Sequence, residues 1–259
     1  MIRIVRFLTP AGPAFGLVEN GIAYALSGDP FSAPLQPGEH LGAVESLKLL
    51  PPVQPSKIIC VGRNYAAHAA EHSAPVPEEP MLFLKPPSAL IGHGEPILIP
   101  GGIGRVEHEA ELAVIIGRPA QRVAQHEALS YVLGYTCAND VSARDLQRKD
   151  AQWGRAKGFD TFCPLGPWIV TDLDPRDVEV RCRVNGEQRQ RARTAEMVFD
   201  VPALIAFISR VMTLLPGDVI LTGTPAGVGP LAEGDTVEVE IEGIGVLHNP
   251  VHSGPAWAE

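Results

Sequence analysis

Three carboxylates next to two apolar runs are the residues in this sequence with the clearest chemical potential. Glu109 and Glu111 stand at the start of the apolar run 112–116, and Asp140 ends the run 131–139. Because side chains alternate along a strand, Glu109 and Glu111 are expected on one side, about 7 Å apart. Carboxylates at the mouth of a buried strand repel each other and resist desolvation, so a cation must hold them. Oxygen donors without a nearby Cys or His pair favour Mg²⁺ or Mn²⁺. The alternative is a pair of solvated residues on an edge strand.

A second candidate is the pair His68 and Glu71, three residues apart in a predicted short helix over residues 66–71. That spacing places both on one helix face, within hydrogen-bonding reach. A carboxylate beside an imidazole orients the ring and raises its basicity, as a water-activating base requires. A Pro-rich segment over 75–80 follows and could act as a lid. An exposed helix pair without function is the alternative.

Lysine usage and a glycine-rich loop add further candidates. The chain has only five lysines against sixteen arginines, and Lys85 and Lys157 stand in apolar or aromatic surroundings near the carboxylates. A compact ammonium there would balance the carboxylates or bind a substrate oxyanion, or it would simply form a salt bridge. The loop 223–229 lacks the Gly-Lys-Ser/Thr of a phosphate-binding loop. Its N–H groups and the Thr224 hydroxyl suit a substrate carboxylate.

Composition limits the partners and the compartment. The 259 residues are 45% hydrophobic and carry a formal charge of −9 without a basic stripe, which argues against a nucleic-acid surface. No apolar run is long enough to cross a membrane. The four cysteines have no metal-ligand spacing and lie mostly in apolar runs, so they are expected to be reduced and buried in a cytoplasmic protein. Arginines over 181–193 are expected to face solvent or a subunit contact.

The order of predicted elements favours an α+β fold, mainly β, with a folded or rolled sheet. Residues 1–55 form a small β-rich unit that starts with a strand over 1–7 and ends in the stiff linker 51–55. Residues 56–259 form the larger unit. Asn20-Gly21 and Asn185-Gly186 mark hairpins, and helices are predicted over 142–149 and 201–215.

Six segments together resemble the fumarylacetoacetate hydrolase superfamily. They are residues 62–68, 82–86, 108–112, 139–145, 157–164 and 223–229, in the order of that family and across nearly the whole larger unit. The resemblance implies a mixed β-roll or sandwich with a smaller N-terminal domain, and a homodimer. It also implies a Mg²⁺ or Mn²⁺ site at Glu109, Glu111 and Asp140.

The resemblance assigns roles to further residues. It implies a lid helix with His68 and Glu71 and a site lysine at Lys157. Substrate contacts map onto Gln147 and Thr224, with Arg63 and Lys85 nearby.

Family members act on 2-oxo or 2-hydroxy-enoic acids. The pairing of His68 with Glu71 favours hydrolysis of a C–C bond in an acylpyruvate-type β-diketo acid, or decarboxylation of a related oxo acid, because isomerisation needs no nucleophilic water. The alternative is a 2-hydroxyhepta-2,4-diene-1,7-dioate isomerase or 5-oxopent-3-ene-1,2,5-tricarboxylate decarboxylase of aromatic catabolism. A protein that binds metal and oxo acid without turnover is the third possibility.

Overall fold

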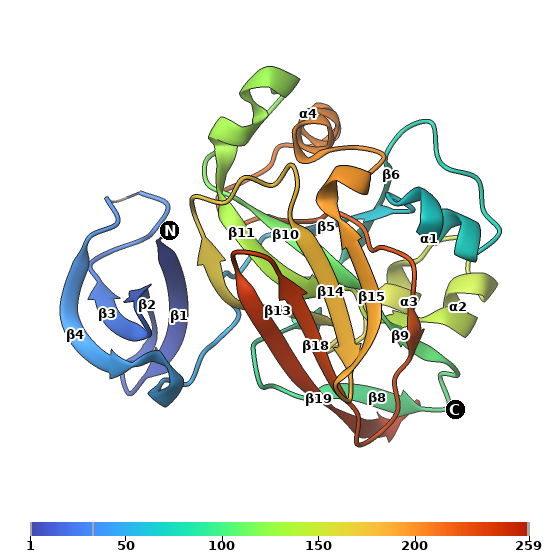
Figure 1. The fold of residues 1–259 in the computed structure, drawn as a ribbon, viewed down its shortest axis with the longest axis horizontal. Helices are drawn as coiled ribbons and strands as arrows, with labels where there is room; N and C mark the ends of the chain where they lie inside the picture. The colour runs from blue at the N-terminus through green and yellow to red at the C-terminus, as the bar shows by residue number, and fades with distance from the viewer. Residues whose placement is uncertain (1, 33, 258–259) are drawn as a thin grey trace.

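Strands dominate residues 2–32 and 34–257, the part of the chain that the computed structural model describes. The fold class is α+β, mainly β, as the sequence predicts. Among the described residues, backbone hydrogen bonds join the strands into sheets of eleven, five and three strands. Figure 1 shows the first four strands at one end of the molecule and the remaining strands and helices beyond them.

The N-terminal strands form an antiparallel meander. They are β1 (Arg3–Thr9), β2 (Gly12–Glu19), β3 (Ile22–Leu26) and β4 (Pro37–Ala43). Asn20 and Gly21 both have positive φ, which confirms the predicted tight hairpin. Met1, at the start of the predicted strand 1–7, lies outside the described residues. Because β1 pairs with β13 of the larger unit, one sheet spans both units, and the boundary at 55/56 stays a prediction.

The large sheet continues from β1 into the strands that carry the site. In order, they are β13 (Cys163–Val170), β11 (Val132–Asn139), β10 (Ala110–Ile116), β16 (Val219–Leu221), β5 (Ile58–Gly62) and β6 (Met81–Lys85), with β7 (Leu90–Ile91) beside β13. Every residue of β10 is buried. Leu112 and Val114 join one apolar cluster and Ala113 and Ile115 another, which confirms that this strand is covered on both faces.

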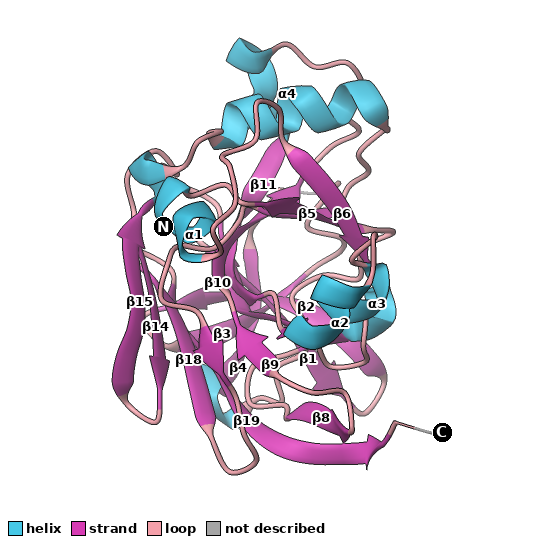
Figure 2. Ribbon diagram, turned by 90° about the vertical axis from the view of Figure 1, so that its right-hand side faces the viewer, coloured by secondary structure: helices cyan, strands magenta, loops and turns pink. Residues whose placement is uncertain are grey.

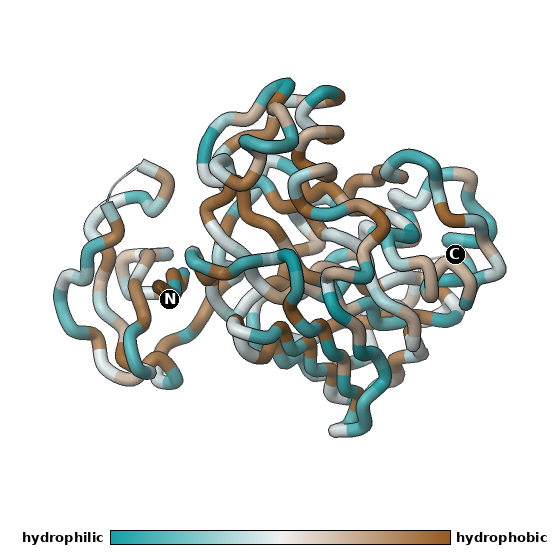
Figure 3. Tube along the Cα trace, turned by 45° about the horizontal axis from the view of Figure 1, so that its top comes forward, coloured by the Kyte–Doolittle hydropathy of each residue, from teal (hydrophilic) through white to brown (hydrophobic). Residues whose placement is uncertain are grey.

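A second sheet packs across the first. It consists of β15 (Glu187–Arg193), β14 (Glu179–Val184), β18 (Thr236–Ile241), β19 (Gly245–Ala256) and β8 (Ile97–Gly101). Strands β14 and β18 contact β10, and the apolar side chains between the layers form the main core. Figure 3 shows the hydrophobic, brown segments of the trace mainly in the interior of the molecule and the hydrophilic, teal segments mainly at its periphery. The short strands β9 (Val106–His108), β12 (Ser142–Ala143) and β17 (Gly229–Pro230) pair at the entrance to β10.

Helices flank the open end of the roll. In Figure 2, α1 (Ala66–Glu71) lies to the left, α2 (Arg144–Lys149) and α3 (Gly154–Lys157) to the right, and α4 (Val201–Val211) at the top. Single 3₁₀ segments cover Val44–Ser46, Pro87–Ala89, Gln125–Tyr131 and Thr194–Glu196. Within the described residues, no helix has the length and apolar character needed to cross a bilayer.

Two predicted helix boundaries are wrong for identifiable reasons. The helix predicted over 142–149 begins at Arg144, because Ser142 pairs with Glu107 in a β-bridge and its hydroxyl donates to the Asp140 carbonyl at 2.8 Å. The helix predicted over 201–215 ends at Val211, because Met212 adopts extended backbone angles. The helix over 66–71 is confirmed.

Candidate active site

The three predicted carboxylates converge at one end of β10 and β11. Pairing of Ala110 with Asn139 puts Glu109 beside Asp140, whose N–H donates to the Glu109 carbonyl at 2.9 Å. One oxygen of Glu109, Glu111 and Asp140 each lies within 4.8 Å of the others, and all three side chains are buried. Alternation along one strand does not extend to Glu109, because this residue lies in the break between β9 and β10. Glu109 and Glu111 nevertheless line the same cavity.

Two cations neutralise Glu109 directly. The Lys157 ammonium donates to Glu109 at 2.7 Å and to Asp140 at 2.8 Å, and the Arg144 guanidinium donates to Glu109 and, at 2.5 Å, to Glu107. Burial by itself opposes ionisation of Glu109, but Arg144 and Lys157 outweigh it and hold the pKa of this carboxyl far below its usual range. Burial likewise disfavours the charged form of Lys157, yet Asp140 and Glu109 raise its pKa. Both groups therefore stay ionised near neutral pH.

Lys85 lies behind the carboxylates rather than in the cavity. Its side chain is buried, and its ammonium donates to Asp140 at 2.6 Å and to the Val141 carbonyl at 3.2 Å. The residue is not among those that line the cavity. In this arrangement Lys85 fixes the orientation of Asp140, and its ammonium does not reach the cavity where a substrate would bind.

Glu111 has the environment expected of a metal ligand. Its side chain accepts a hydrogen bond from the Gly223 N–H at 2.6 Å and has no ion-pair partner among the described residues. Burial, followed by repulsion from Asp140 and Glu109, raises the pKa of this carboxyl well above its usual value. A divalent cation between the three groups would relieve this repulsion. Because all donors are carboxylate oxygens, the residues fit Mg²⁺ or Mn²⁺.

His68 and Glu71 are joined on α1, as their spacing predicts. The His68 Nδ1 and Glu71 Oε2 atoms are 3.4 Å apart. Glu71 also accepts the Gly227 N–H, at 3.1 and 3.2 Å from its two oxygens, so this carboxylate joins α1 to the glycine-rich loop. Burial lowers the pKa of His68, which keeps its ring neutral near pH 7. A neutral imidazole facing the cavity can accept a proton.

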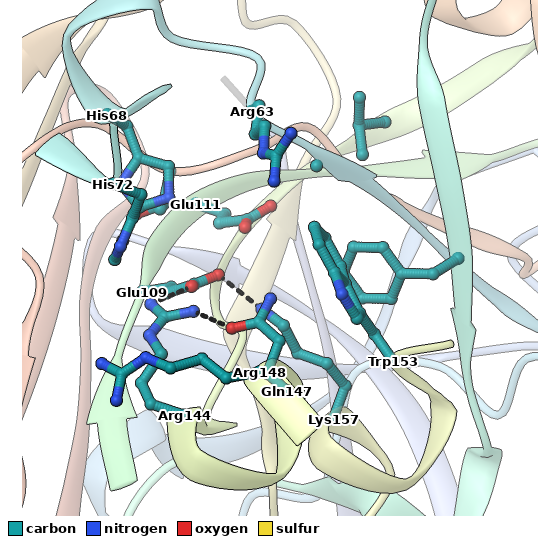
Figure 4. A pocket seen from close by; sticks show the side chains of 14 residues that line it. Arg63, His68, His72, Glu109, Glu111, Arg144, Gln147, Arg148, Trp153 and Lys157 are labelled. Carbon is teal, nitrogen blue, oxygen red and sulfur yellow. Dashed lines mark hydrogen bonds and ion pairs between the residues drawn. The ribbon is translucent and has the colours of Figure 1, made fainter. Parts of the chain in front are cut away.

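The cavity has a volume of about 350 Å³, which suits a small metabolite. His68, Glu109, Glu111 and Lys157 surround its inner part, and Figure 4 shows Arg63, Trp153 and Arg148 around the remainder. The Arg63 guanidinium carbon lies 5.9 Å from the centre of the Trp153 ring. Gln147 also lines the cavity and accepts a hydrogen bond from Arg144 at 2.6 Å.

Thr224 reaches the cavity, but its hydroxyl is occupied by the protein. The hydroxyl donates to the Ala110 carbonyl at 2.9 Å and accepts from the Gln190 amide at 2.7 Å. The same amide donates to the Pro225 carbonyl at 2.7 Å, while its oxygen accepts the Ala110 N–H at 3.0 Å. Since its one proton is used, the Thr224 hydroxyl has only a lone pair left for a substrate.

Sequence reasoning missed Arg144 and Gln190. Arg144 lies within the segment 139–145 that carried the resemblance, four residues after Asp140, and that proximity was the available signal. Gln190 lies among alternating arginines in β15, where it is the only buried residue of the strand. A polar residue at an inward position of a strand was the signal there. Both side chains act on the site through tertiary contacts that spacing does not reveal.

The fold and this cavity define a mainly-β protein with a buried carboxylate cluster and an adjoining His–Glu pair. Comparison with known proteins places it more closely. The fumarylacetoacetate (FAA) hydrolase C-terminal family model matches residues 57–252, and the Rv2993c-like N-terminal model matches residues 2–52. The chain therefore belongs to the fumarylacetoacetate hydrolase family, a family of enzymes.

Named relatives match most of the chain or nearly all of it. Protein Rv2993c of Mycobacterium tuberculosis is 49% identical over 96% of this chain and 98% of its own length. The mitochondrial oxaloacetate tautomerase fahd2 of Xenopus laevis is 46% identical over 84% of this chain and 72% of its own length. The crystal structure of 2-hydroxyhepta-2,4-diene-1,7-dioate isomerase from Mycobacterium marinum superposes with a TM-score of 0.90 at 48% identity, covering 98% of this chain and 99% of that one.

Proposed function

We propose that this protein is a divalent-metal-dependent enzyme that acts on a 2-oxo acid through its enol form. The observation that carries the proposal is the convergence of three buried carboxylates with a neutral, carboxylate-oriented histidine around one small cavity. Mg²⁺ or Mn²⁺ held by Glu109, Glu111 and Asp140 would act as a Lewis acid toward the carboxylate and keto oxygens of the substrate.

The chain's own residues supply the charge stabilisation and the proton transfer. The buried ammonium of Lys157, fixed between Glu109 and Asp140, is positioned to stabilise negative charge that develops on the substrate. His68 accepts the proton, because its ring is neutral near pH 7 and Glu71 holds its Nδ1 side. Protonation of His68 is then favoured by the Glu71 carboxylate beside it.

The outer part of the cavity supports a dicarboxylic substrate. Arg63 and Arg148 both line it, and Arg148 also donates to the exposed Asp145 carboxylate at 3.1 Å. A second substrate carboxylate at the distal end would meet these two cations. Oxaloacetate and 2-hydroxyhepta-2,4-diene-1,7-dioate, the compounds in the names of two of the relatives described above, are both dicarboxylates. We therefore place proton transfer on a 2-oxo dicarboxylic acid, tautomerisation or isomerisation, as the favoured reaction.

Hydrolysis of a C–C bond in an acylpyruvate-type β-diketo acid is the second candidate. The specific observation in its favour is the His68–Glu71 pair, which is equally suited to removing a proton from water. Decarboxylation would need the same stabilised enolate and no water. A protein that binds metal and oxo acid without turnover has no need of this pair.

The reaction is identified by measuring the enol absorbance and the release of pyruvate when the Mg²⁺-loaded enzyme is mixed with each of three substrates. These are enol-oxaloacetate, 2-hydroxyhepta-2,4-diene-1,7-dioate and acetylpyruvate. Proton transfer predicts loss of the enol absorbance without release of pyruvate from acetylpyruvate. His68→Ala should lower kcat by about 100-fold or more without loss of metal binding. The control variant His252→Ala, at an exposed position, should keep the wild-type kcat. Pyruvate release alone would reverse the order of the two candidates. If none of the three substrates is turned over, the result would favour a protein that binds metal and oxo acid without catalysis.

The distal arginines make a separate prediction about specificity. Arg148→Ala should raise KM for a dicarboxylate about 10-fold, the weight of one exposed charge-assisted hydrogen bond, and leave KM for acetylpyruvate unchanged. Arg210→Ala, an exposed arginine on α4, is the matched control. An equal effect on both substrates would contradict a distal carboxylate contact at Arg148.

A further inference from the structure

A second group of metal-ligating side chains lies at the C-terminal end of α1. His68 and Glu71 lie on the helix and His72 is its C-cap; these three residues are here called the α1 triad. They occupy positions i, i+3 and i+4, and the His72 N–H still donates to the His68 carbonyl at 3.4 Å, so the three side chains lie on one side of the helix end. One ligand atom from each lies within 4.8 Å of the others. The centroids of the His68 and His72 rings are 4.7 Å apart, and the two ring planes make an angle of 82°. Figure 4 shows the two rings side by side at the cavity.

The donor set of the α1 triad differs from that of the carboxylate cluster. Two imidazoles and one carboxylate suit Zn²⁺ and similar borderline ions, whereas Glu109, Glu111 and Asp140 offer only oxygen. In a tetrahedral zinc site with bonds of about 2.0–2.2 Å, neighbouring ligand atoms lie about 3.3–3.6 Å apart. The His68 Nδ1 to Glu71 Oε2 distance of 3.4 Å already matches. Histidines at i and i+4 on one helix face are a recurrent zinc-binding arrangement.

The surroundings leave the α1 triad open to an ion. Glu71 and His72 are exposed, and His68 and His72 both line the cavity, so an ion can enter from solvent and a water can complete the coordination. The Glu109 carboxylate acts on both imidazoles and attracts a cation, while the Arg144 guanidinium opposes it. The Gly227 N–H contacts both Glu71 oxygens, and one oxygen is sufficient for the metal.

We propose that the α1 triad is a binding site for Zn²⁺ or a chemically similar transition-metal ion, separate from the carboxylate cluster, and that occupation of it inhibits the enzyme. Inhibition follows because a metal-bound imidazole has no lone pair with which to accept a proton. The inhibitory part rests on the proposed role of His68 as the base. The binding part rests only on the geometry of the three side chains.

Binding is tested on the full chain preloaded with saturating Mn²⁺. Titration with Zn²⁺ in a calorimeter should show one additional ion per chain, while the electron paramagnetic resonance signal of bound Mn²⁺ persists. Co²⁺ in place of Zn²⁺ should give the intense visible absorption of a tetrahedral site with nitrogen ligands. His72→Ala should weaken Zn²⁺ binding at least about 100-fold, since loss of a ligand exceeds loss of an outer-shell partner. His72→Gln tests the same loss with a side chain of similar size, and His252→Ala is the control.

Unchanged Zn²⁺ affinity in both His72 variants, or displacement of Mn²⁺ without an additional site, would overturn the proposal. For inhibition, Zn²⁺ should stop wild-type turnover over the same concentration range in which it binds, and His72→Ala should shift that range by the same factor. Inhibition that His72→Ala leaves unshifted would overturn the inhibitory part. If the protein proves to have no turnover, the proposed function fails, and the calorimetric and Co²⁺ measurements still decide whether the site exists.

Discussion

Replacing Glu111 by Gln should stabilise the metal-free protein, although Glu111 is central to the proposed site. The side chain is buried at 2% exposure, and its carboxylate faces those of Glu109 and Asp140 without a cationic partner of its own among the described residues. Gln keeps the shape and an oxygen that can accept the Gly223 N–H. The substitution therefore removes a repulsive charge and little else.

The size of the effect follows from the separation of the charges. At 4.8 Å and an effective dielectric constant of about 20, two unit charges repel by about 3.5 kcal/mol. Glu111 faces two such neighbours, and Lys157 offsets part of the repulsion. Replacement of poorly compensated buried charges is typically stabilising by about 1–4 kcal/mol. We expect a gain of about 2 kcal/mol at pH 8, or about 4–8 °C in Tm for a chain of this length.

The gain should depend on pH with a definite sign. Because the pKa of Glu111 is raised in the folded state, the folded protein holds this proton above the unfolded value of about 4.5. The contribution of Glu111 to the stability of the wild type therefore falls as pH rises above 4.5, and the advantage of Glu111→Gln grows over the same interval. Below pH 4.5 the carboxyl is protonated in both states and the advantage disappears.

Thermal melting in EDTA at pH 4.5 and pH 8 measures this difference, with the exposed Glu79→Gln as the control. Added Mg²⁺ or Mn²⁺ at 100 times its Kd should stabilise the wild type by about 2.7 kcal/mol and the variant much less. A variant that melts at or below the wild-type temperature in EDTA at pH 8 would refute the reasoning. So would a variant that gains as much stability from the metal as the wild type.

Two further substitutions test the residues that support the site. Lys85→Met should lower the free energy of unfolding by about 3 kcal/mol, because it leaves Asp140 with one buried cation instead of two. Chemical denaturation measures this change, with the exposed Lys149→Met as the control, and equal stability of the two variants would contradict the prediction. Gln190→Leu should lower kcat by at least about 10-fold, since it leaves buried polar groups of the Ala110 and Pro225 backbone without their partner. Gln188→Leu on the exposed face of β15 is the control. If Gln190→Leu lowers stability but leaves kcat unchanged, Gln190 has a purely structural role.

Local pattern was sufficient for the elements that repeat a simple period or carry a strong turn signal. The β14–β15 hairpin, the short helix α1 and the fully buried β10 are confirmed, because Asn-Gly turns and continuous apolar runs act over a few residues. The start of α2 was mispredicted because Ser142 is held in a bridge to Glu107, a residue distant in the sequence. No local propensity reports such a pairing.

The site was predictable to the extent that its residues belong to short motifs. The carboxylates Glu109, Glu111 and Asp140 meet as expected, since β10 and β11 are antiparallel neighbours. The sequence could not predict which of Lys85 and Lys157 borders the cavity, because both are lysines in apolar surroundings. Only the packing shows that Lys157 borders the cavity and that Lys85 lies behind Asp140.

The charge balance of the cavity links the proposed metal site to the proposed chemistry. With Glu109, Glu111 and Asp140 all ionised, three carboxylates face the ammonium groups of Lys85 and Lys157, which leaves one negative charge in excess, while Arg144 is shared with Glu107. In the proposed reaction, a divalent cation would turn the excess into one positive charge, which a substrate carboxylate would neutralise. Formation of an enolate would add one negative charge, and the proton transferred from the substrate to His68 would add one positive charge next to it. Metal and 2-oxo acid should therefore bind cooperatively, because each corrects the charge that the other leaves in a buried site.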